Sequence, residues 1–483
     1  MHSYHIFYFP FKWEFPNKKD KLFSEQTKLS SIPTDKFSNW ERTPEISKDT
    51  EANELYNEKN YFYEFVHPLL YDTNEEDSLV FHYERKETKT GDVRYIFNVR
   101  DKKEYNLKVD AINLNLYSTG VGVLSFYLEN HTYEDKEDIL TINQYGRRIF
   151  PPFIGDVENR YEIAEFIAIE NLGGSKNYKE DFTKYTNKDA WKPASFIDDL
   201  ISDLSSEINI IPVIDDRMFV NCWYPNDDLS LKYKDKDELP FNAYLGKDEF
   251  LYKYIYVDVS SITCKNDRMM SDILQEQTYK RWQKDGTLFG MSRYSFVTLT
   301  NHEFYGTILG PHMRTIYSRM IEMVLVTKAS ILKFSMEVTE VSKLSKKDPA
   351  NKELVDRIAS LYREYIHFIN QFYFNEITIQ DQGIELYNLM KKTLNISDYV
   401  KSLGEEIEEL HRYVVLLEDR ERNKRASALN LIATIFVPAS LTAALFGMNW
   451  ANVGNCFWTM IAFVVILGII GSLLILCLTK KNK

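Results

Sequence analysis

The stretch RNKRASALNLIATIFVPASLTAALFGMNW, Arg422 to Trp450, decides the fold class of this chain. It leads into a run, Ala426 to Thr479, that contains no Asp, Glu, Lys or Arg. The run divides into two apolar segments, 426–446 and 456–478, each close to the roughly 20 residues that a helix needs to cross a bilayer. We therefore expect two transmembrane helices joined by a short outer loop, 447–455.

Basic residues flank both predicted spans and indicate their orientation. Such residues concentrate on the cytoplasmic side of a membrane. Both termini should therefore lie inside, in a multi-pass protein of the inner (cytoplasmic) membrane with a basic tail at 479–483. The residues expected to form an inner basic ring are Lys424, Arg425, Lys480 and Lys481.

Small and polar residues recur along the first predicted span at steps of three and four, so they share one helical face. Polar side chains are costly in lipid. Such a stripe suits close helix packing or the wall of a water-filled pore, whereas a plain hairpin anchor would not need it. The stripe consists of Asn423, Ala426, Asn430, Ala433, Val437, Ser440 and Ala444.

The segment 396–425 before the first span carries an apolar heptad pattern and predicts a long stalk helix. In the same phase the pattern continues to Glu421 and Lys424, where a ring of charges would form an electrostatic barrier. A coiled-coil oligomerisation stalk with interfacial lysines is the alternative, and the two interpretations are compatible. The seam residues are Ile396, Val400, Leu403, Ile407, Leu410, Val414 and Leu417.

The stretch at 422–450, with its "IATIF-x-P" run and Gly-Met-Asn, resembles the CorA superfamily of divalent-cation transporters, and the lysine-rich end of the chain agrees with this resemblance. This resemblance implies a homopentameric funnel in which Gly447, Met448 and Asn449 form an outer selectivity ring around hydrated Mg²⁺, with Asn449 as the residue nearest the metal. Mg²⁺ loses its water reluctantly, so amide and carbonyl oxygens around the water shell suit it. The resemblance also adds Leu429 to the pore-lining stripe.

Two features depart from the family pattern. The loop WANVGNCFW after Gly-Met-Asn contains no acidic residue, which leaves open how cations would concentrate at the outer mouth. Ala426 and Val437 stand where the transporters often carry larger gating residues.

The composition excludes several other classes of protein. A net charge of -12 argues against a nucleic-acid binder, so we expect no direct nucleic-acid partner. Four cysteines without CxxC spacing and nine histidines without metal-ligand spacing argue against a disulfide framework and a zinc site.

The residues before the stalk predict a mixed α/β cytosolic domain, 1–310, followed by a helical region, 311–395. Alternating patterns predict strands, and two other runs, AEFIAIE and ASFIDDLISDLSSEI, are interpreted as helices. Two long helices are expected beside the stalk, Pro311–Ser345 and Pro349–Lys392, connected by a turn at Lys343–Lys352. Pro311 is expected at the first position of the first helix. The predicted strands are the first fifteen residues, Leu107–Asn130, Ile210–Tyr224, Phe250–Val259 and Arg293–Thr300.

A ligand site in this domain is one hypothesis. Gly120 and Gly122 could bring backbone N–H groups to a phosphate, with charge from Arg147, Arg148 or Arg293. A glycine turn between two strands is the alternative, because neither a Walker A nor a GxGxxG pattern is present.

The aromatic-rich amino-terminal half, with YSTGVGVLSFYLEN and GMSRYSFVTLT, is similar to the large CorA-like membrane effectors of type III CRISPR systems. That resemblance implies activation by a nucleotide messenger, S-adenosylmethionyl-AMP. A housekeeping Mg²⁺ transporter and a membrane-anchored nucleotide sensor that disrupts the membrane are alternatives. A membrane-tethered enzyme is disfavoured, since the acidic runs at 75–77 and 198–199 have no convergent partners in the sequence, and we expect no catalytic residue.

Overall fold

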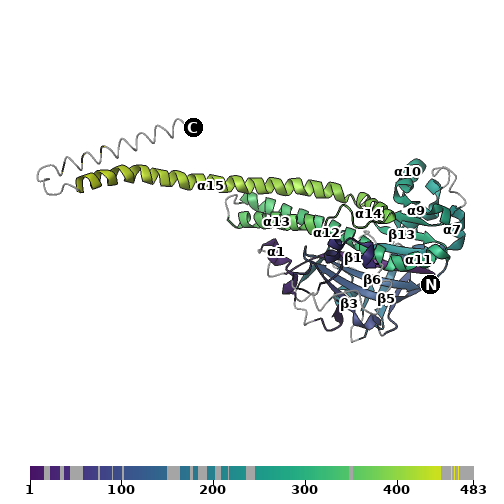
Figure 1. Cartoon of the computed structure of the whole chain (residues 1–483). Helices are drawn as coiled ribbons and strands as arrows, with labels where there is room; N and C mark the ends of the chain where they lie inside the picture. The colour runs from purple at the N-terminus through teal and green to yellow at the C-terminus, as the bar shows by residue number, and fades with distance from the viewer. Residues whose placement is uncertain are drawn as a thin grey trace. The chain divides into compact units, whose positions relative to one another are not determined.

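The protein was analysed as a computed structural model, whose colour scheme and element labels are given in Figure 1. The chain divides into two compact units, Met1–Ile407 and Glu408–Lys483. The structure describes residues 1–15, 22–32, 37–43, 58–73, 75, 77–89, 91–99, 103–149, 164–173, 178–182, 193–201, 208–215, 217–234, 245–347, 352–447, 458, 462 and 466.

Within these ranges the first unit is built on one 13-stranded sheet. The main path runs β11-β12-β13-β10-β1-β6-β5-β4-β7-β8, with β2 and β3 branching from β5 and with β9 beside β1. All pairs are antiparallel except β10 with β13. The strands are β1 (Ser3–Glu14), β2 (Trp40–Arg42), β3 (Val80–Arg85), β4 (Arg94–Val99), β5 (Glu104–Tyr117), β6 (Val121–Asn130), β7 (Ala164–Glu170), β8 (Tyr178–Asp181), β9 (Asn209–Pro212), β10 (Phe219–Pro225), β11 (Thr278–Tyr279), β12 (Leu288–Met291) and β13 (Ser295–Thr300).

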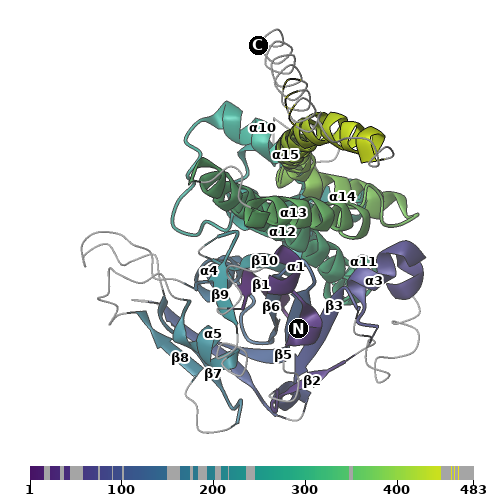
Figure 2. The ribbon, with the colours of Figure 1, turned by 90° about the vertical axis from the view of Figure 1, so that its left-hand side faces the viewer.

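Helices cover both faces of the sheet, which explains why β1 is buried along most of its length. One set of alternating β1 side chains, including Phe7 and Trp13, joins the hydrophobic core with residues of α4 and α5. On the opposite face Tyr8 donates a hydrogen bond from its hydroxyl to the Ser318 carbonyl of α12, at 3.3 Å. Because α12 packs on β1 and β6, the sheet supports the long helices directly (Figure 2).

The helices fall into a short set within the sheet domain and a long set that follows β13. The short set comprises α1 (Phe23–Gln26), α3 (His67–Leu70), α4 (Lys136–Gly146), α5 (Ser195–Leu200), α7 (Asp227–Lys234), α9 (Glu249–Tyr256) and α10 (Asp267–Gln277). The long set comprises α11 (Phe304–Arg314), α12 (Ile316–Lys347), α13 (Lys352–Gln371), α14 (Asp381–Thr393) and α15 (Ile396–Gly447).

Two secondary-structure predictions are wrong. The segment Phe250–Val259, expected as a strand, is mostly the helix α9, because Asp248 caps it by accepting a hydrogen bond from Leu251 N and its buried residues recur at helical spacing. The run AEFIAIE, expected as a helix, is β7, which pairs with β4 and β8. Strand pairing on both sides overrides the weak helical propensity of so short a segment.

The start of the helical region also differs from the prediction. Pro311 does not open a helix but lies inside α11, which begins seven residues earlier at Phe304. The break falls instead at Thr315, whose φ of -108° and ψ of -83° separate α11 from α12. Gly310 lies within α11, where its bare backbone packs against Trp223 and a Cβ would lie 3.0 Å from the ring.

The second expected helix, Pro349–Lys392, is two helices, α13 and α14. A junction was expected at Lys343–Lys352. The two helices do separate within this segment, since α12 ends at Lys347 and α13 begins at Lys352. The other strand predictions are confirmed by β1, by β5 with β6, by β9 with β10 and by β13, while the described part of ASFIDDLISDLSSEI contains α5.

Candidate functional site

The helix α15 carries the residues that the sequence places in the stalk and the pore. It runs without interruption from Ile396 to Gly447. Its first seam residues, Ile396, Val400, Leu403 and Ile407, are all buried.

The buried seam packs within one subunit. In this part of the chain the Tyr365 hydroxyl of α13 donates to the Val400 carbonyl at 3.2 Å, and a Cβ on Gly404 would lie 2.6 Å from the same hydroxyl oxygen. The seam from Ile396 to Ile407 is therefore an intramolecular contact, and the coiled-coil alternative is wrong for these residues.

The predicted pore stripe lies on the later part of α15. With 3.6 residues per turn, its spacing places these side chains along one side of the helix. Every described side chain from 418 to 437 is exposed, so exposure in one chain does not single out the stripe. The residues of the predicted pore stripe that are exposed on α15 are Asn423, Ala426, Leu429, Asn430, Ala433, Val437, Ser440 and Ala444.

The remaining pore residues can be placed only in part. Gly447 is the last residue of α15, whereas Met448 and Asn449 lie outside the described residues, as do Lys480 and Lys481. Lys424 and Arg425 are exposed on α15. The Lys424 ammonium forms an ion pair with Glu421 at 3.1 Å, one turn earlier, so the predicted basic ring includes an acidic neighbour.

Buried polar residues join α12 to the sheet. Glu322, which is 2% exposed, accepts hydrogen bonds from the Tyr117 hydroxyl at 2.9 Å and from the Asn115 amide. Burial raises the pKa of the Glu322 carboxyl. One turn away, Arg319 forms an ion pair with the buried Glu58 at 3.4 Å. We call Glu58, Asn115, Tyr117, Arg319 and Glu322 the α12 polar cluster.

A buried lysine of α12 occupies the glycine turn that was one candidate for phosphate binding. The turn connects β5 to β6, which confirms the alternative interpretation of a turn between strands, and Gly120 has a φ of +75°. Lys333 Nζ donates to the carbonyls of Gly120 at 3.2 Å and of Trp13 at 3.4 Å. Burial lowers the pKa of Lys333 to about 7. Gly122 lies under Phe11, since a Cβ there would be 2.3 Å from its ring.

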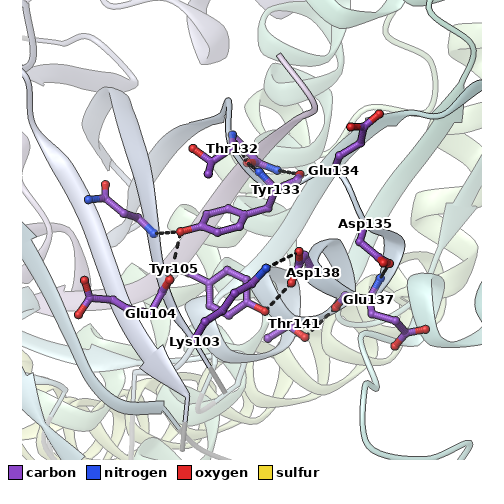
Figure 3. A network of polar contacts seen from close by, with 12 residues as sticks. Lys103, Glu104, Tyr105, Thr132, Tyr133, Glu134, Asp135, Glu137, Asp138 and Thr141 are labelled. Carbon is purple, nitrogen blue, oxygen red and sulfur yellow. Dashed lines mark hydrogen bonds and ion pairs between the residues drawn. The ribbon is translucent and has the colours of Figure 1, made fainter. Parts of the chain in front are cut away.

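The helix α4 carries Arg147 at its carboxyl-terminal end and is anchored at the other end by the network in Figure 3. Asp138 of α4 accepts hydrogen bonds from Lys103 at 2.7 Å and from the Tyr105 hydroxyl at 2.8 Å. The Lys103 ammonium also lies 4.9 Å from the centre of the Tyr133 ring. This network fixes α4 against β5 and so sets the position of Arg147.

Of the three predicted arginines, Arg147 contacts the ring of Tyr294. The Arg147 guanidinium lies 5.5 Å from the centre of the Tyr294 ring, and Arg217 approaches the same ring at 5.3 Å. Arg148 pairs with Arg217 in an isolated β-bridge, while Arg293 precedes Tyr294 in the chain. The structure therefore places Arg147 against Tyr294, links Arg148 to this region only through its bridge to Arg217, and leaves the glycine turn in a separate environment around Lys333.

The described residues contain no metal-ligand cluster and no helix suited to span a membrane. In these ranges no cluster of three or more His, Cys, Asp or Glu side chains is arranged to hold a metal ion. Nor does any helix in the described part of the chain have the length and apolar character needed to cross a membrane. The first predicted span lies in α15, and the second lies outside the described residues except for positions 458, 462 and 466. Both transmembrane spans remain predictions.

Comparison with known protein families identifies the region that contains the long helices. The family model described as CorA-like Mg2+ transporter protein matches residues 305–481. Residues 305–481 belong to the CorA superfamily. This CorA region begins in α11 and includes α12 to α15, and its family consists of membrane transporters for divalent cations. The comparison with curated proteins found no match.

Sequence reasoning missed the α12 polar cluster and Lys333. Their signal was present in IYSRMIEMVLVTKASILKF, a largely apolar helical stretch whose charged residues are Arg319, Glu322, Lys328 and Lys333. Charged residues in such a stretch are rarely buried unless they are paired, which indicates a polar contact across the helix interface. Their partners on β5 and in the segment at Glu58 are more than 200 residues away in sequence, so only the fold could reveal them.

Proposed function

We propose that the chain is one subunit of an oligomeric divalent-cation channel of the CorA type, with the stripe on α15 facing the pore. The observation that carries this proposal is that one unbroken helix bears both the buried seam at 396–407 and the polar stripe at 423–444. It lies in the segment that matches the CorA family. A single helix per chain cannot enclose a pore, so a ring of copies is required, and five copies would agree with the family.

The proposed selectivity ring consists of Gly447, Met448 and Asn449. Amide and carbonyl oxygens from several copies would bind the water shell of Mg²⁺ without stripping it, which suits a small cation that exchanges water reluctantly. Small residues such as Ala433 and Ser440 would keep the lumen wide enough for a hydrated ion.

The long helix offers a physical route for gating. Near its start α15 accepts a hydrogen bond from Tyr365 of α13 at the Val400 carbonyl, and an α-helix transmits displacement along its axis because its backbone is hydrogen-bonded from turn to turn. A change in the cytosolic unit that moves the start of α15 would therefore move the stripe. A ligand could bias this change only if it binds one state more tightly than the other.

The test is Mg²⁺ flux into liposomes that contain the purified full chain. We expect flux in the wild type, and at least a tenfold loss in Asn449→Ala and in Ala433→Trp, which would fill the lumen. Asn370→Ala, at an exposed position on α13, is the matched control and should retain wild-type flux. Absence of flux under every Mg²⁺ and nucleotide condition, or wild-type flux in both pore variants, would overturn the proposal.

A second function, membrane disruption by an anchored nucleotide sensor, is favoured by the uncharged outer loop WANVGNCFW. Release of a trapped dye larger than a hydrated ion distinguishes disruption from conduction. Either function would be activated by S-adenosylmethionyl-AMP if the protein acts in a type III CRISPR system. This part of the proposal rests on the sequence resemblance alone. Adding this messenger to the flux and dye assays tests it directly.

A further inference from the structure

The α12 polar cluster contains two acidic groups and one basic group. Its carboxylates, Glu58 and Glu322, are 3% and 2% exposed, and Arg319 supplies its positive charge. Arg42 and Asp72 lie beyond the cluster and neutralise each other through two hydrogen bonds at 2.6 and 2.7 Å. With both carboxylates ionised, the cluster therefore holds one buried negative charge in excess. Such a charge is costly, and a buried carboxylate lowers this cost by binding a proton.

The two carboxylates are held in different ways. Glu58 forms the ion pair with Arg319 at 3.4 Å. Glu322 instead accepts hydrogen bonds from two neutral donors, the Tyr117 hydroxyl and the Asn115 amide, and both donate to the same oxygen, Oε1. A proton on the second oxygen, Oε2, would leave both hydrogen bonds in place. Glu322 is therefore the carboxylate that can lose its charge with the least rearrangement.

The described groups around Glu322 supply no second positive charge. Burial raises the pKa of the neighbouring tyrosines, so their hydroxyls remain neutral. Burial also lowers the pKa of His82 to about 4, so this imidazole is uncharged at neutral pH. Besides Arg319 on α12, the groups that face the cluster are Tyr8 on β1, His82 on β3, Tyr117 on β5, Tyr127 on β6 and Tyr71 at the end of α3.

We propose that the α12 polar cluster is a proton-binding site that couples the contact between α12 and the sheet to pH. The proton, taken from water, binds to Oε2 of Glu322 and makes the cluster neutral, while both hydrogen bonds from β5 stay in place. Release of the proton returns a net charge to the buried contact and weakens the packing of α12 on the sheet. Acid therefore tightens this contact, and a rise in pH loosens it.

The position of α12 gives this contact a wider effect. α12 packs on β1 and β6 and also on α13 and α14, so it lies between the sheet and the helices that precede α15. A looser contact with the sheet reduces the support of those helices. The device belongs to the first unit and requires no conduction.

The direction of the pH dependence follows from the burial of Glu322. Burial raises its folded pKa above the unfolded value, so the folded state binds this proton more tightly. The stabilisation is complete below the unfolded pKa and is lost as pH rises through the folded pKa. His82 acts in the opposite direction, because its stabilisation is lost as pH falls from 6.5 toward about 4. A comparison of variants separates the two groups.

Denaturation of the full chain in detergent, from about pH 4 to about pH 8, tests the site. The folded-to-unfolded ratio of the wild type, divided by that of Glu322→Gln, should fall as pH rises, by up to about tenfold per pH unit for one proton. Glu340→Gln is the matched control on α12. Glu340 is 56% exposed, and a hydrogen bond from Lys343 lowers its pKa, so any contribution from it has the opposite sign.

Hydrogen–deuterium exchange locates the change within the fold. After correction for the intrinsic pH dependence of exchange, the backbone amides of α12 should lose protection as pH rises in the wild type but not in Glu322→Gln. Loss of protection that is equal in both proteins would separate the pH dependence of α12 from Glu322 and overturn the proposal.

Two tyrosine variants identify the carboxylate and keep the test open if Glu322→Gln does not fold. Tyr117→Phe removes a donor from Glu322, which disfavours its ionised form and should move the titration up by about one pH unit. Tyr71→Phe removes the donor to Glu58 at 3.2 Å and should leave the titration in place.

Three further results would overturn the proposal: a constant ratio of wild type to Glu322→Gln across the pH range, the same pH-dependent ratio for Glu340→Gln, or a shift caused by Tyr71→Phe and not by Tyr117→Phe. Folding and exchange are measured without any flux. This proposal and the proposed channel therefore fail separately.

Discussion

The two longest helices among the described residues, α12 and α15, bury their polar residues to very different extents. On α12, Glu322, Ser330 and Lys333 are at most 5% exposed and bond to groups on the sheet. On α15, every described side chain from 418 to 437 is exposed. Polar residues of α12 are thus explained by the fold of one chain, whereas those of the stripe on α15 are not.

This difference in burial predicts that substitutions on α12 mainly affect the stability of the fold, whereas substitutions on the far part of α15 mainly affect function. Removing a buried, bonded polar group should lower the free energy of unfolding, because its partners lose their hydrogen bonds. Replacing an exposed residue on the far part of α15 should leave the isolated fold intact and act only through lipid, water, ions or another copy.

The largest effect is expected for Glu322→Ala, at the centre of the α12 polar cluster. The change leaves the Asn115 amide and the Tyr117 hydroxyl without their acceptor and increases the net positive charge beside Arg319. Breaking such a buried set costs about 3–5 kcal/mol. Chemical denaturation followed by circular dichroism measures the loss. Glu322→Gln keeps an acceptor and should lose less; equal losses in the two variants would contradict the role of the hydrogen bonds.

Ile407→Ala tests the buried seam at the start of α15. Ile407 is 1% exposed, and truncating a buried isoleucine costs about 2–4 kcal/mol through lost burial and the cavity left behind. The same denaturation experiment measures this change. A loss below about 1 kcal/mol would show that the seam is not packed in the folded subunit.

Lys333 gives a pH-dependent effect of intermediate size. Its folded pKa, lowered to about 7, lies below the unfolded value, so the unfolded state binds more protons between these two values. The free energy of unfolding should therefore rise as pH increases from about 7 to 9, by at most about 1.4 kcal/mol per pH unit from this group.

Lys333→Met removes this ionisation and should flatten the pH dependence over the same range. The exposed Lys343 of α12 provides the control substitution, Lys343→Met, which should keep the wild-type slope. The same slope in wild type and Lys333→Met would assign the pH dependence to another group.

The smallest effect is expected for Leu416→Ala on the far part of α15. Leu416 is 68% exposed, so its truncation should change the free energy of unfolding of a dissociated subunit by less than about 0.5 kcal/mol. The denaturation midpoint, measured at several protein concentrations, checks this. A larger loss that appears only in the assembled state would place Leu416 in a contact between copies and sharpen the contrast with α12.

The local sequence pattern was sufficient to predict a helix or strand where one face of that element packs on a single surface. The heptad spacing from Ile396 to Ile407 predicted the buried side of α15, and the alternation in 107–130 predicted β5, β6 and the turn at Gly120. The sequence pattern predicted the wrong secondary structure for α9 and β7. Tyr, Phe and Ile in α9 favour strands in general, yet Asp248 caps a helix there, while β7 is set by its two strand neighbours.

The sequence by itself determined the long helix, the apolar tail and the resemblance to CorA, because periodicity and composition act over neighbouring residues. Only the tertiary structure decided which charges are buried and which residues share a site. Glu322 meets β5, Lys333 meets the turn at Gly120, and Arg293 meets the end of α14 across long separations in the chain. These contacts depend on how the sheet and helices pack, and no local pattern encodes that arrangement.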